Sequence, residues 1–341
     1  MSDRRLVVVD ADVLGRERTG DETYVLNLLR ELPAPAAAAG LEIAAVTRRP
    51  DLVPAGIEAY ELGVDSQIVR MAWSLPRVLR RLRPALVHTQ YAVPLRCPCP
   101  AVVTIHDLSF ERGSTAMPPG DRRIFRRVVP RAARRAARVL TVSERSARDL
   151  RELYGVAPDR IVVTPNGVDP AFSPGPAGAD GAYALAVGAV QERKNQAAAL
   201  AAAREAGLPL VVAGPIRDDA LAARLRDGGA QLEGYVAQER LVELYRGAAC
   251  LVQASRYEGF GLPVVEAMAC GTPVVVVDEP ALVEVAGGAA VVAGENELGA
   301  AIGVAVADRR RLREAGLVRA RAFSWRAVAE RTAAVYAETI G

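Results

Sequence analysis

The chain's single lysine lies in a segment whose residue types suit a bound phosphate. Of the 43 basic residues, all but Lys194 are arginine, and Lys194 follows Arg193 where an apolar stretch gives way to a helical pattern. Lysine is a compact point charge suited to phosphate, and arginine is not equivalent to it. Two cations at a helix start oppose the helix dipole unless an anion is present, which weakens the alternative of a solvated basic pair. We therefore predict that Arg193 and Lys194 neutralise a diphosphate and the charge that develops on it when a bond to it breaks.

Two glutamates flank a glycine-rich turn that follows another apolar stretch. Glu258 precedes the sequence GFGLP, and Glu266 lies one turn into the helix that this sequence opens. Gly259 and Gly261 let backbone amides approach a ligand closely, and free amides at a helix start favour a diphosphate. Carboxylates recognise paired sugar hydroxyls, as they do for the ribose of dinucleotides. In isolation the same turn would be an ordinary glycine-rich connection with solvent-facing acids.

The two histidines follow apolar strands, and their contexts differ. His106 and Asp107 end the stretch VVTIHD, and ligands of open α/β sheets bind at the carboxyl ends of the strands. We predict that His106 is a site residue and that His88 is structural.

A repeated strand–helix pattern positions these segments and predicts parallel sheets. Strands are expected at 6–10, 43–47, 86–89, 102–105, 139–142, 183–187, 210–213, 249–253, 274–277 and 289–292. Helices are expected from residue 19 and at 70–82, 121–137, 144–153, 195–206, 217–227, 238–247 and 263–269.

The length of 341 residues exceeds one ordinary core, so two domains are expected. A Pro- and Gly-rich stretch, 170–181, interrupts the pattern. We expect four parts: an N-terminal domain (1–168), a linker (169–181), a C-terminal domain (182–324) and a C-terminal helix (325–341). The cleft between two such domains is the default ligand site.

Three of these motifs together resemble glycosyltransferase family 4. The stretch from Ser255 to Val275 is similar to the family's EGFGLPxxEAMAxGxPVV signature, with Glu258 and Glu266 separated by seven residues. The Arg-Lys-Asn step at 193–195 and the His-Asp step at 106–107 are similar to two further family elements. The resemblance covers nearly the whole chain and implies an α/β GT-B fold. That fold has two facing Rossmann-like domains with parallel sheets, a deep interdomain cleft and a last helix that crosses back to the first domain. The resemblance implies that the N-terminal domain binds the acceptor and that the C-terminal domain binds the nucleotide-sugar donor.

The resemblance implies a retaining transfer of a hexosyl group from a nucleoside diphosphate sugar to an acceptor hydroxyl. It gives catalytic roles to His106, Arg193, Lys194 and Glu258. It gives donor contacts to Gly20, Arg193, Lys194, Tyr235, Val236, Glu258, Gly259, Phe260, Gly261, Leu262 and Glu266, with Glu266 on the ribose. Many relatives have two glycines where this chain has Thr19-Gly20.

The Arg-Lys-Asn form is common among relatives that use GDP-mannose, so mannosyl transfer is favoured, with GDP-mannose or another nucleoside diphosphate hexose as donor. Two rivals stand beside transfer: a nucleotide-sugar epimerase or hydrolase on the same fold, and a non-catalytic nucleotide-binding protein. No cofactor or metal is expected. The two histidines and four cysteines lack zinc-site spacing, and Asp10-Ala11-Asp12 ends the first strand rather than forming a metal motif.

Charge is distributed unevenly along the chain. Residues 1–165 hold 26 arginines and 19 acidic residues, and the net charge of the whole chain is +3. An arginine-rich stretch at 121–138 is best explained as a solvated face, with contact to anionic lipid as the alternative. Nucleic acid is not expected, because aromatic residues make up only 5% and offer no stacking platform.

The chain shows neither a run of apolar residues long enough to cross a membrane nor a signal-peptide pattern. We expect a cytoplasmic protein, with the alternative of a peripheral position at the inner membrane surface.

The expected acceptor is a saccharide, a lipid-linked molecule or a small molecule.

Overall fold

The computed structural model describes residues 5–16, 19–112, 117–175 and 181–341. Contacts divide the chain into two compact units, each described here by itself. Unit 1 comprises Met1–Leu108, Pro119–Gly167 and Ser324–Gly341, and unit 2 comprises Ser109–Pro118 and Val168–Phe323. Part of the expected linker, 176–180, lies outside the described residues.

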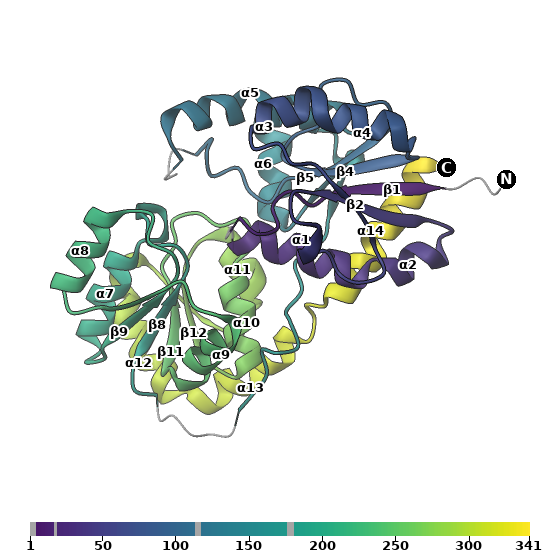
Figure 1. Cartoon of the computed structure of the whole chain (residues 1–341). Coiled ribbons are helices and arrows are strands. Elements are labelled where there is room, and N and C mark those ends of the chain that lie inside the picture. The colour runs from purple at the N-terminus through teal and green to yellow at the C-terminus, as the bar shows by residue number, and fades with distance from the viewer. Residues whose placement is uncertain (1–4, 17–18, 113–116, 176–180) are drawn as a thin grey trace. The chain divides into compact units, whose positions relative to one another are not determined.

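Unit 1 is built on a parallel sheet of seven strands in the order β3-β2-β1-β4-β5-β6-β7 (Figure 1). The strands are β1 (Leu6–Asp10), β2 (Glu42–Thr47), β3 (Glu58–Glu61), β4 (Leu86–Gln90), β5 (Ala101–Thr104), β6 (Arg138–Thr141) and β7 (Ile161–Val163). The central strand β1 reads LVVVD and is buried throughout, as a strand covered on both faces must be.

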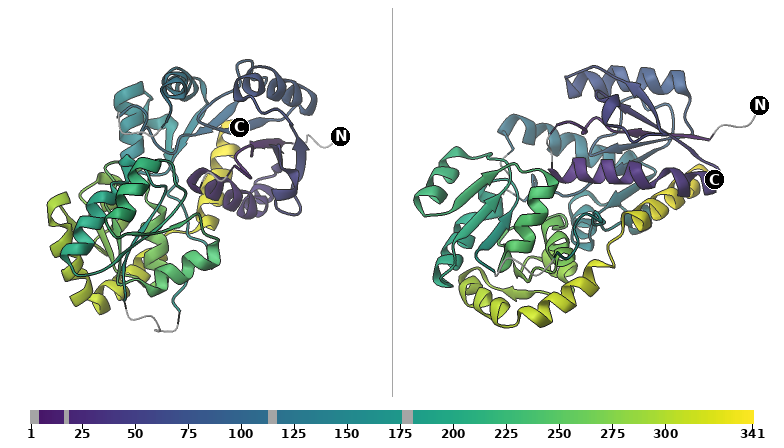
Figure 2. Two further views of the ribbon diagram at one scale, coloured as in Figure 1. Left: turned by 60° about the vertical axis from the view of Figure 1, so that its left-hand side comes forward. Right: turned by 60° about the horizontal axis from the view of Figure 1, so that its bottom comes forward.

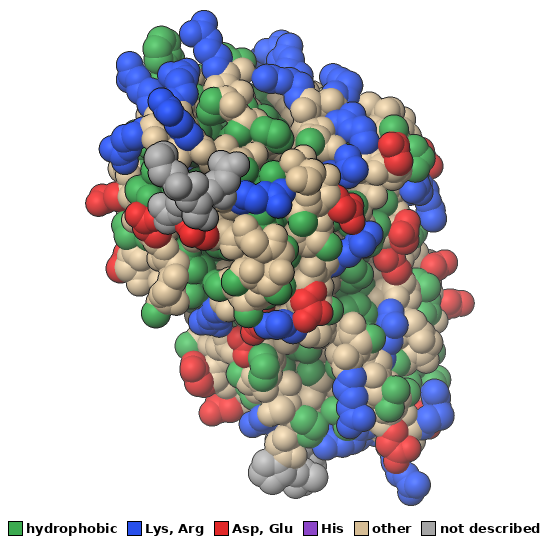
Figure 3. All heavy atoms as spheres, turned by 90° about the vertical axis from the view of Figure 1, so that its right-hand side faces the viewer, with side chains coloured by type: hydrophobic (Ala, Val, Ile, Leu, Met, Phe, Trp, Pro, Cys, Tyr) green, Lys and Arg blue, Asp and Glu red, His purple; other side chains and the backbone are tan. Residues whose placement is uncertain are grey.

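The helices of unit 1 are α1 (Thr19–Glu31), α2 (Pro33–Ala38), α3 (Gln67–Val69), α4 (Leu75–Leu82), α5 (Pro119–Arg135), α6 (Glu144–Tyr154) and α14 (Trp325–Ile340). A π-helical turn, Arg70–Ser74, joins α3 to α4, and 3₁₀ turns occupy Pro50–Leu52 and Pro158–Arg160. Helix α14 packs against α1 and α2 (Figures 1 and 2). Figure 3 shows arginine side chains along the upper margin of the molecule, at the height of α4 and α5 in Figure 1.

A glycine is required where the chain passes from one unit to the other. A Cβ on Gly167 would lie 2.2 Å from the backbone nitrogen of Trp325, so only glycine allows the two segments to pass. The turn at 166–169 therefore has a packing role.

Unit 2 contains a second parallel sheet, of six strands in the order β10-β9-β8-β11-β12-β13. Its strands are β8 (Ala184–Val187), β9 (Leu210–Ala213), β10 (Gln231–Gly234), β11 (Cys250–Gln253), β12 (Val274–Val277) and β13 (Val291–Ala293). Its helices are α7 (Gln196–Glu205), α8 (Asp219–Asp227), α9 (Gln238–Gly247), α10 (Leu262–Cys270), α11 (Pro280–Ala286), α12 (Leu298–Ala307) and α13 (Arg309–Ala320). Two 3₁₀ turns, Glu192–Lys194 and Glu295–Glu297, precede α7 and α12.

The expectation of two Rossmann-like units with parallel sheets is confirmed, and the differences concern individual elements. Three strands, β3, β7 and β10, are not among those expected from the sequence. They are short strands at sheet edges, and β3 and β10 have the polar sequences EAYE and QLEG. The helix expected at 70–82 begins instead with the π-helical turn. The strand expected at 289–292 is shifted to Val291–Ala293. Across the described residues, no helix is long and apolar enough to cross a membrane.

Candidate functional site

The strand order of unit 2 places two of the predicted segments beside each other. Strand β8 has β9 on one side and β11 on the other. The strand order therefore reverses between β8 and β11. Open α/β sheets bind ligands at such a switch point, outside the carboxyl ends of the strands. The loop after β8 carries Arg193 and Lys194, and the loop after β11 carries Glu258.

Arg193, Lys194 and Glu258 meet in an ion cluster at this switch point. The Lys194 Nζ lies 2.6 Å from Glu258 Oε1, and an Arg193 guanidinium nitrogen lies 3.4 Å from Glu258 Oε2. The same Arg193 nitrogen donates to the carbonyl of Tyr257 at 2.5 Å, and the amide of Gln253 donates to Glu258 Oε1 at 2.9 Å. The structure thus brings together three of the four residues to which the resemblance gives catalytic roles.

Electrostatics keep the Glu258 carboxylate ionised although it is only 6% exposed. Burial by itself raises the pKa of this group, but the charges of Lys194 and Arg193, with hydrogen bonds from Lys194 and Ser255, lower the pKa to about 2. Two cations around one carboxylate leave a net positive charge. A diphosphate entering here would meet donors already fixed in place, which is how enzymes stabilise a charge that develops during reaction.

Local backbone geometry explains why the residue after Lys194 is an asparagine. Asn195 has a positive φ of 53° and stands immediately before α7. Among residues other than glycine, asparagine adopts this left-handed conformation most readily. The turn also holds Lys194 close to Gly188, where an added Cβ would lie 3.3 Å from Lys194 Cε.

The glycine-rich turn before α10 is shaped by packing within unit 2. Gly261 has a φ of 109°, and a Cβ there would lie 2.8 Å from the side chain of Leu282. The Phe260 ring is buried and lies edge-on to Phe323, with ring centroids 5.6 Å apart. Gly259 is also buried, and Leu262 begins α10. Because the Phe260 side chain packs inward, its predicted donor contact would have to come from its backbone.

Glu266, the predicted ribose ligand, is held by a tyrosine from α9. The Tyr245 hydroxyl donates to Glu266 Oε2 at 2.7 Å, and the Tyr245 ring is fully buried. Burial raises the pKa of Glu266 to about 7, with the hydrogen bond from Tyr245 acting against this rise and the charge of Asp169 adding to it. The carboxyl group is therefore about half ionised near neutral pH.

Tyr235 and Val236 follow the edge strand β10, two strands away from β8 in the sheet. The Tyr235 side chain is 60% exposed, and Val236 is half-buried. Gly234 before them has a positive φ of 70°, and its carbonyl accepts from the amide of Gly214. Their predicted contact with the base stays a prediction.

His106 lies in unit 1, two residues beyond β5, in a polar and aromatic environment. Its Nε2 is 2.8 Å from the side-chain oxygen of Gln90, at the end of β4, and its ring contacts those of Tyr24 and Tyr91. Burial lowers the pKa of His106, and the charges of Asp21 and Asp107 offset only part of this. The imidazole is therefore a neutral hydrogen-bonding group rather than a cation.

The first turn of α1 reaches toward His106. Asp21 Oδ1 lies 3.9 Å from His106 Nε2, and Gly20 occupies the preceding, exposed position of the helix. The predicted contact of Gly20 with a diphosphate stays a prediction.

His88 is structural, as predicted. It is fully buried between the Tyr336 hydroxyl, 2.5 Å from Nδ1, and the Thr104 hydroxyl, 2.7 Å from Nε2. Burial lowers the pKa of His88 to about 3, and repulsion from His106 when that ring is protonated contributes to this, so the His88 ring is neutral.

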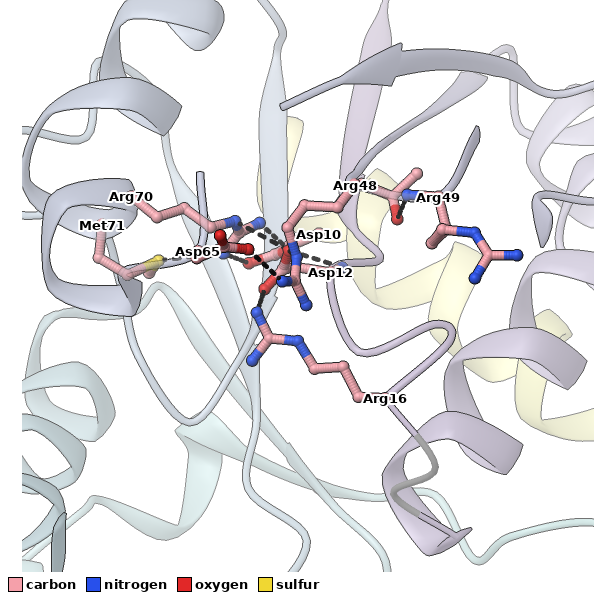
Figure 4. Close-up of polar contacts among 9 residues, drawn as sticks. Asp10, Asp12, Arg16, Arg48, Arg49, Asp65, Arg70 and Met71 are labelled. Atoms are coloured by element: carbon pink, nitrogen blue, oxygen red, sulfur yellow. Dashed lines mark hydrogen bonds and ion pairs between the residues drawn. The ribbon is translucent and has the colours of Figure 1, made fainter. Parts of the chain in front are cut away.

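A network of ion pairs covers the carboxyl end of β1, at the switch point of the unit 1 sheet (Figure 4). The fully buried Arg70 pairs with both carboxylate oxygens of Asp10. Asp12 pairs with Arg16 and, at 3.0 Å, with Arg48. The two carboxylates of the Asp10-Ala11-Asp12 segment are thus bound by guanidinium groups.

Comparison with known proteins identifies the family. The model of Glycosyltransferase Family 4 matches residues 18–172, and that of Glycosyl transferases group 1 matches residues 172–308. The O-antigen chain mannosyltransferase B of Escherichia coli is 32% identical over 302 residues, which are 80% of this chain and 77% of that relative. The chain belongs to glycosyltransferase family 4.

Solved structures agree on the fold of this family 4 glycosyltransferase. Sucrose-phosphate synthase from Thermosynechococcus elongatus aligns with a TM-score of 0.77 at 20% identity, over 98% of this chain and 99% of that one. Anabaena Alr3699/HepE in complex with UDP-glucose aligns with a TM-score of 0.72 at 14% identity, over 97% and 98%. The predicted GT-B fold class is confirmed.

Some residues around these sites were missed by sequence reasoning. Gln253 and Gln90 are the polar last residues of two strands, and the same placement at the carboxyl end of a strand that singled out His106 could have identified both. Gln90 is of further interest because its side-chain nitrogen is buried and has no hydrogen-bond partner among the described residues. Tyr245 gave no signal, since an aromatic residue on a helix is usually part of the core.

Glu266 should make both stability and nucleotide affinity of the glycosyltransferase depend on pH. A carboxyl group with a raised pKa in the folded state destabilises that state as pH rises from its unfolded value, about 4.5, to its folded value, about 7. Glu266→Gln should therefore unfold at a temperature that varies less between pH 5 and pH 8 than the wild type.

Nucleoside diphosphate affinity should rise with pH while stability falls, because ribose hydroxyls donate best to an ionised carboxylate. Wild-type affinity, measured by calorimetry, should increase as pH rises through about 7, and Glu266→Gln should bind weakly at every pH. Glu239→Gln, on the exposed side of α9, is the matched control. Equal pH dependence in all three proteins would remove Glu266 from the site.

Proposed function

We propose that this glycosyltransferase moves a hexosyl group from a nucleoside diphosphate sugar to an acceptor hydroxyl, with retention of the anomeric configuration. The observation that carries the proposal is the cluster of Lys194, Arg193 and buried Glu258 at the switch point of unit 2. A site that must hold a diphosphate and stabilise it as a leaving group requires fixed cations of this kind.

The proposed step breaks the bond between the anomeric carbon and the diphosphate oxygen, and the electron pair stays on that oxygen. Arg193 and Lys194 stabilise this charge. The acceptor oxygen forms the new bond on the same face of the sugar and passes its proton to the departing phosphate. Glu258 does not serve as the nucleophile in this step, because both of its carboxylate oxygens are engaged by cations and its pKa is lowered to about 2. Its proposed role is to position Lys194 and Arg193.

The remaining donor contacts are proposed on the same basis. Glu266 accepts from the ribose hydroxyls, and the backbone of Gly259, Phe260, Gly261 and Leu262 faces the donor sugar and the phosphate. Gly20 approaches the diphosphate, and Tyr235 and Val236 contact the base. His106 is the proposed catalytic residue of unit 1, where its neutral imidazole can form a hydrogen bond with a sugar hydroxyl.

Mannose is the proposed sugar and GDP-mannose the proposed donor, without a metal ion or cofactor. The name of the E. coli relative, a mannosyltransferase, supports the sugar. The Anabaena structure, which contains UDP-glucose, supports a nucleotide sugar and keeps UDP within the range to be tested. The acceptor is a saccharide, lipid-linked or small-molecule hydroxyl compound, and the proposed location is the cytoplasm.

A thermal-shift panel of GDP, UDP, ADP and dTDP sugars tests the donor. A ligand that binds the native state raises the melting temperature, and we expect GDP-mannose to give the largest rise, unchanged by EDTA. Donor consumption should then require an acceptor. Free sugar or an epimer formed without any acceptor would favour the hydrolase or epimerase, and binding without turnover against any acceptor would favour a nucleotide-binding protein.

A further inference from the structure

Unit 1 exposes large apolar side chains beside arginines, on elements remote in sequence from the donor motifs. Ile68, Trp73 and Leu95 are 65%, 60% and 63% exposed. Ile68 lies on α3, Trp73 on the π-helical turn and Leu95 on the loop between β4 and β5. An exposed group of large apolar side chains usually marks a surface that contacts a partner or a membrane.

Hydrogen bonds and a cation–π contact connect these side chains into one surface, which we call the apolar–basic surface. The backbone nitrogen of Leu95 donates to the carbonyl of Met71, in the same turn as Trp73. The Arg135 guanidinium of α5 donates to the carbonyl of Leu95 at 3.3 Å. The Arg77 guanidinium of α4 lies over the Trp73 ring, 5.6 Å from its centroid. The surface thus runs from α3 and α4 across the β4–β5 loop to the end of α5.

The charge of this region is strongly positive. Between residues 66 and 106 the chain has six arginines and no acidic residue. Helix α5 adds seven arginines against one aspartate. Arg77, Arg80, Arg81 and Arg96 are exposed on α4 and the loop. Figure 3 shows basic side chains with apolar ones among them at this height of the molecule.

We propose that the apolar–basic surface docks on a membrane of anionic phospholipids. A tryptophan and aliphatic side chains projecting among arginines match the lipid boundary, where the apolar tips enter the headgroup layer and the arginines pair with phosphates. A nucleic acid would need a stacking platform, whereas the exposed members here are mainly aliphatic. Because the surface is positively charged, it should bind membranes that contain anionic lipid.

The two tryptophans of the chain allow a direct test. Trp73 is exposed and Trp325 is 5% exposed, so a change of tryptophan emission on adding vesicles reports on Trp73. With vesicles of phosphatidylcholine and phosphatidylglycerol in equal parts, we expect a blue shift and quenching by brominated lipid. Neither should occur with phosphatidylcholine alone, and Trp73→Tyr should abolish the signal.

Charge variants test the electrostatic half of the proposal by vesicle sedimentation. Each arginine near an anionic surface contributes about fivefold to affinity, so Arg77→Gln/Arg80→Gln/Arg81→Gln should lose on the order of a hundredfold. The matched control removes the same charge from the exposed side of unit 2, as Arg310→Gln/Arg311→Gln/Arg321→Gln, and should bind normally. Leu95→Ser should weaken binding, whereas Val318→Ser, 67% exposed on α13, should not.

Three results would overturn the proposal. One is absence of binding to anionic vesicles at low salt. Another is equal loss of binding in the two triple variants. The third is a Trp73 blue shift that appears without lipid and grows with protein concentration, which would show that a second copy of the chain covers this surface.

Discussion

Replacing Lys194 by methionine should reduce hexosyl transfer by about a hundredfold to a thousandfold, because removal of one fixed group that stabilises a developing negative charge has this effect. Nucleoside diphosphate affinity, measured by calorimetry, should fall as well. Lys194→Arg should restore only part of the activity, since the guanidinium group is longer and planar. Unchanged nucleoside diphosphate affinity in Lys194→Met would contradict the assignment of this residue to the phosphates.

The Lys194 variant should also lose stability, because the half-buried lysine is paired with the buried carboxylate of Glu258. Breaking a fully buried ion pair on one side typically costs about 3–5 kcal/mol of unfolding free energy. The loss here should be smaller, because Arg193 still pairs with Glu258. The double variant Lys194→Met/Glu258→Gln removes both charges and should recover much of the melting temperature while its activity remains low. That pattern would separate the catalytic effect from simple unfolding.

The sequence predicted the members of the donor site but not their mutual contacts. The sequence predicts that Lys194 contacts the phosphates and, separately, that Glu258 contacts the donor. In the structure they form one ion pair across 64 residues of chain. That contact depends on β8 lying beside β11, and local patterns do not reveal the order of strands in a sheet.

Elements that face away from a core were the hardest to predict. Strands β3 and β10 are polar and lie at sheet edges, so neither apolar runs nor strict alternation mark them. The central strands β9 and β12 are continuous apolar runs, and their predicted bounds match the structure.

Arg70 shows a further limit of local patterns. It is the first residue of the helix that the sequence predicts at 70–82, and in an Arg-rich chain a solvated side chain is the usual outcome. The structure instead buries it completely against Asp10 and Asp12. A buried arginine is recognisable only once its carboxylate partners, 60 residues away in the chain, are known.

Replacing Arg70 by methionine should destabilise unit 1 by about 3–5 kcal/mol, because it leaves the Asp10 carboxylate buried without its main partner. Burial and the charge of Asp10 already raise the pKa of Asp12, against the lowering by Arg70, Arg16 and Arg48, so loss of Arg70 should raise it further. A raised carboxyl pKa favours the folded state at low pH, so the deficit of the variant should be larger at pH 8 than at pH 5.

Denaturant unfolding followed by the emission of Trp325, which is buried in unit 1, measures this effect. The double variant Arg70→Met/Asp10→Asn should recover most of the loss, since it removes a charge from each side of the pair. Arg310→Met is the control, because Arg310 is 93% exposed and its ion pair with Glu314 lies at the surface of α13, where such pairs contribute little. If Arg70→Met and Arg310→Met unfold at the same denaturant concentration, the buried network does not stabilise the end of β1. If the Arg70 variant loses the same unfolding free energy at pH 5 and at pH 8, the loss comes from packing. Only carboxylates left without their cationic partner make the loss depend on pH.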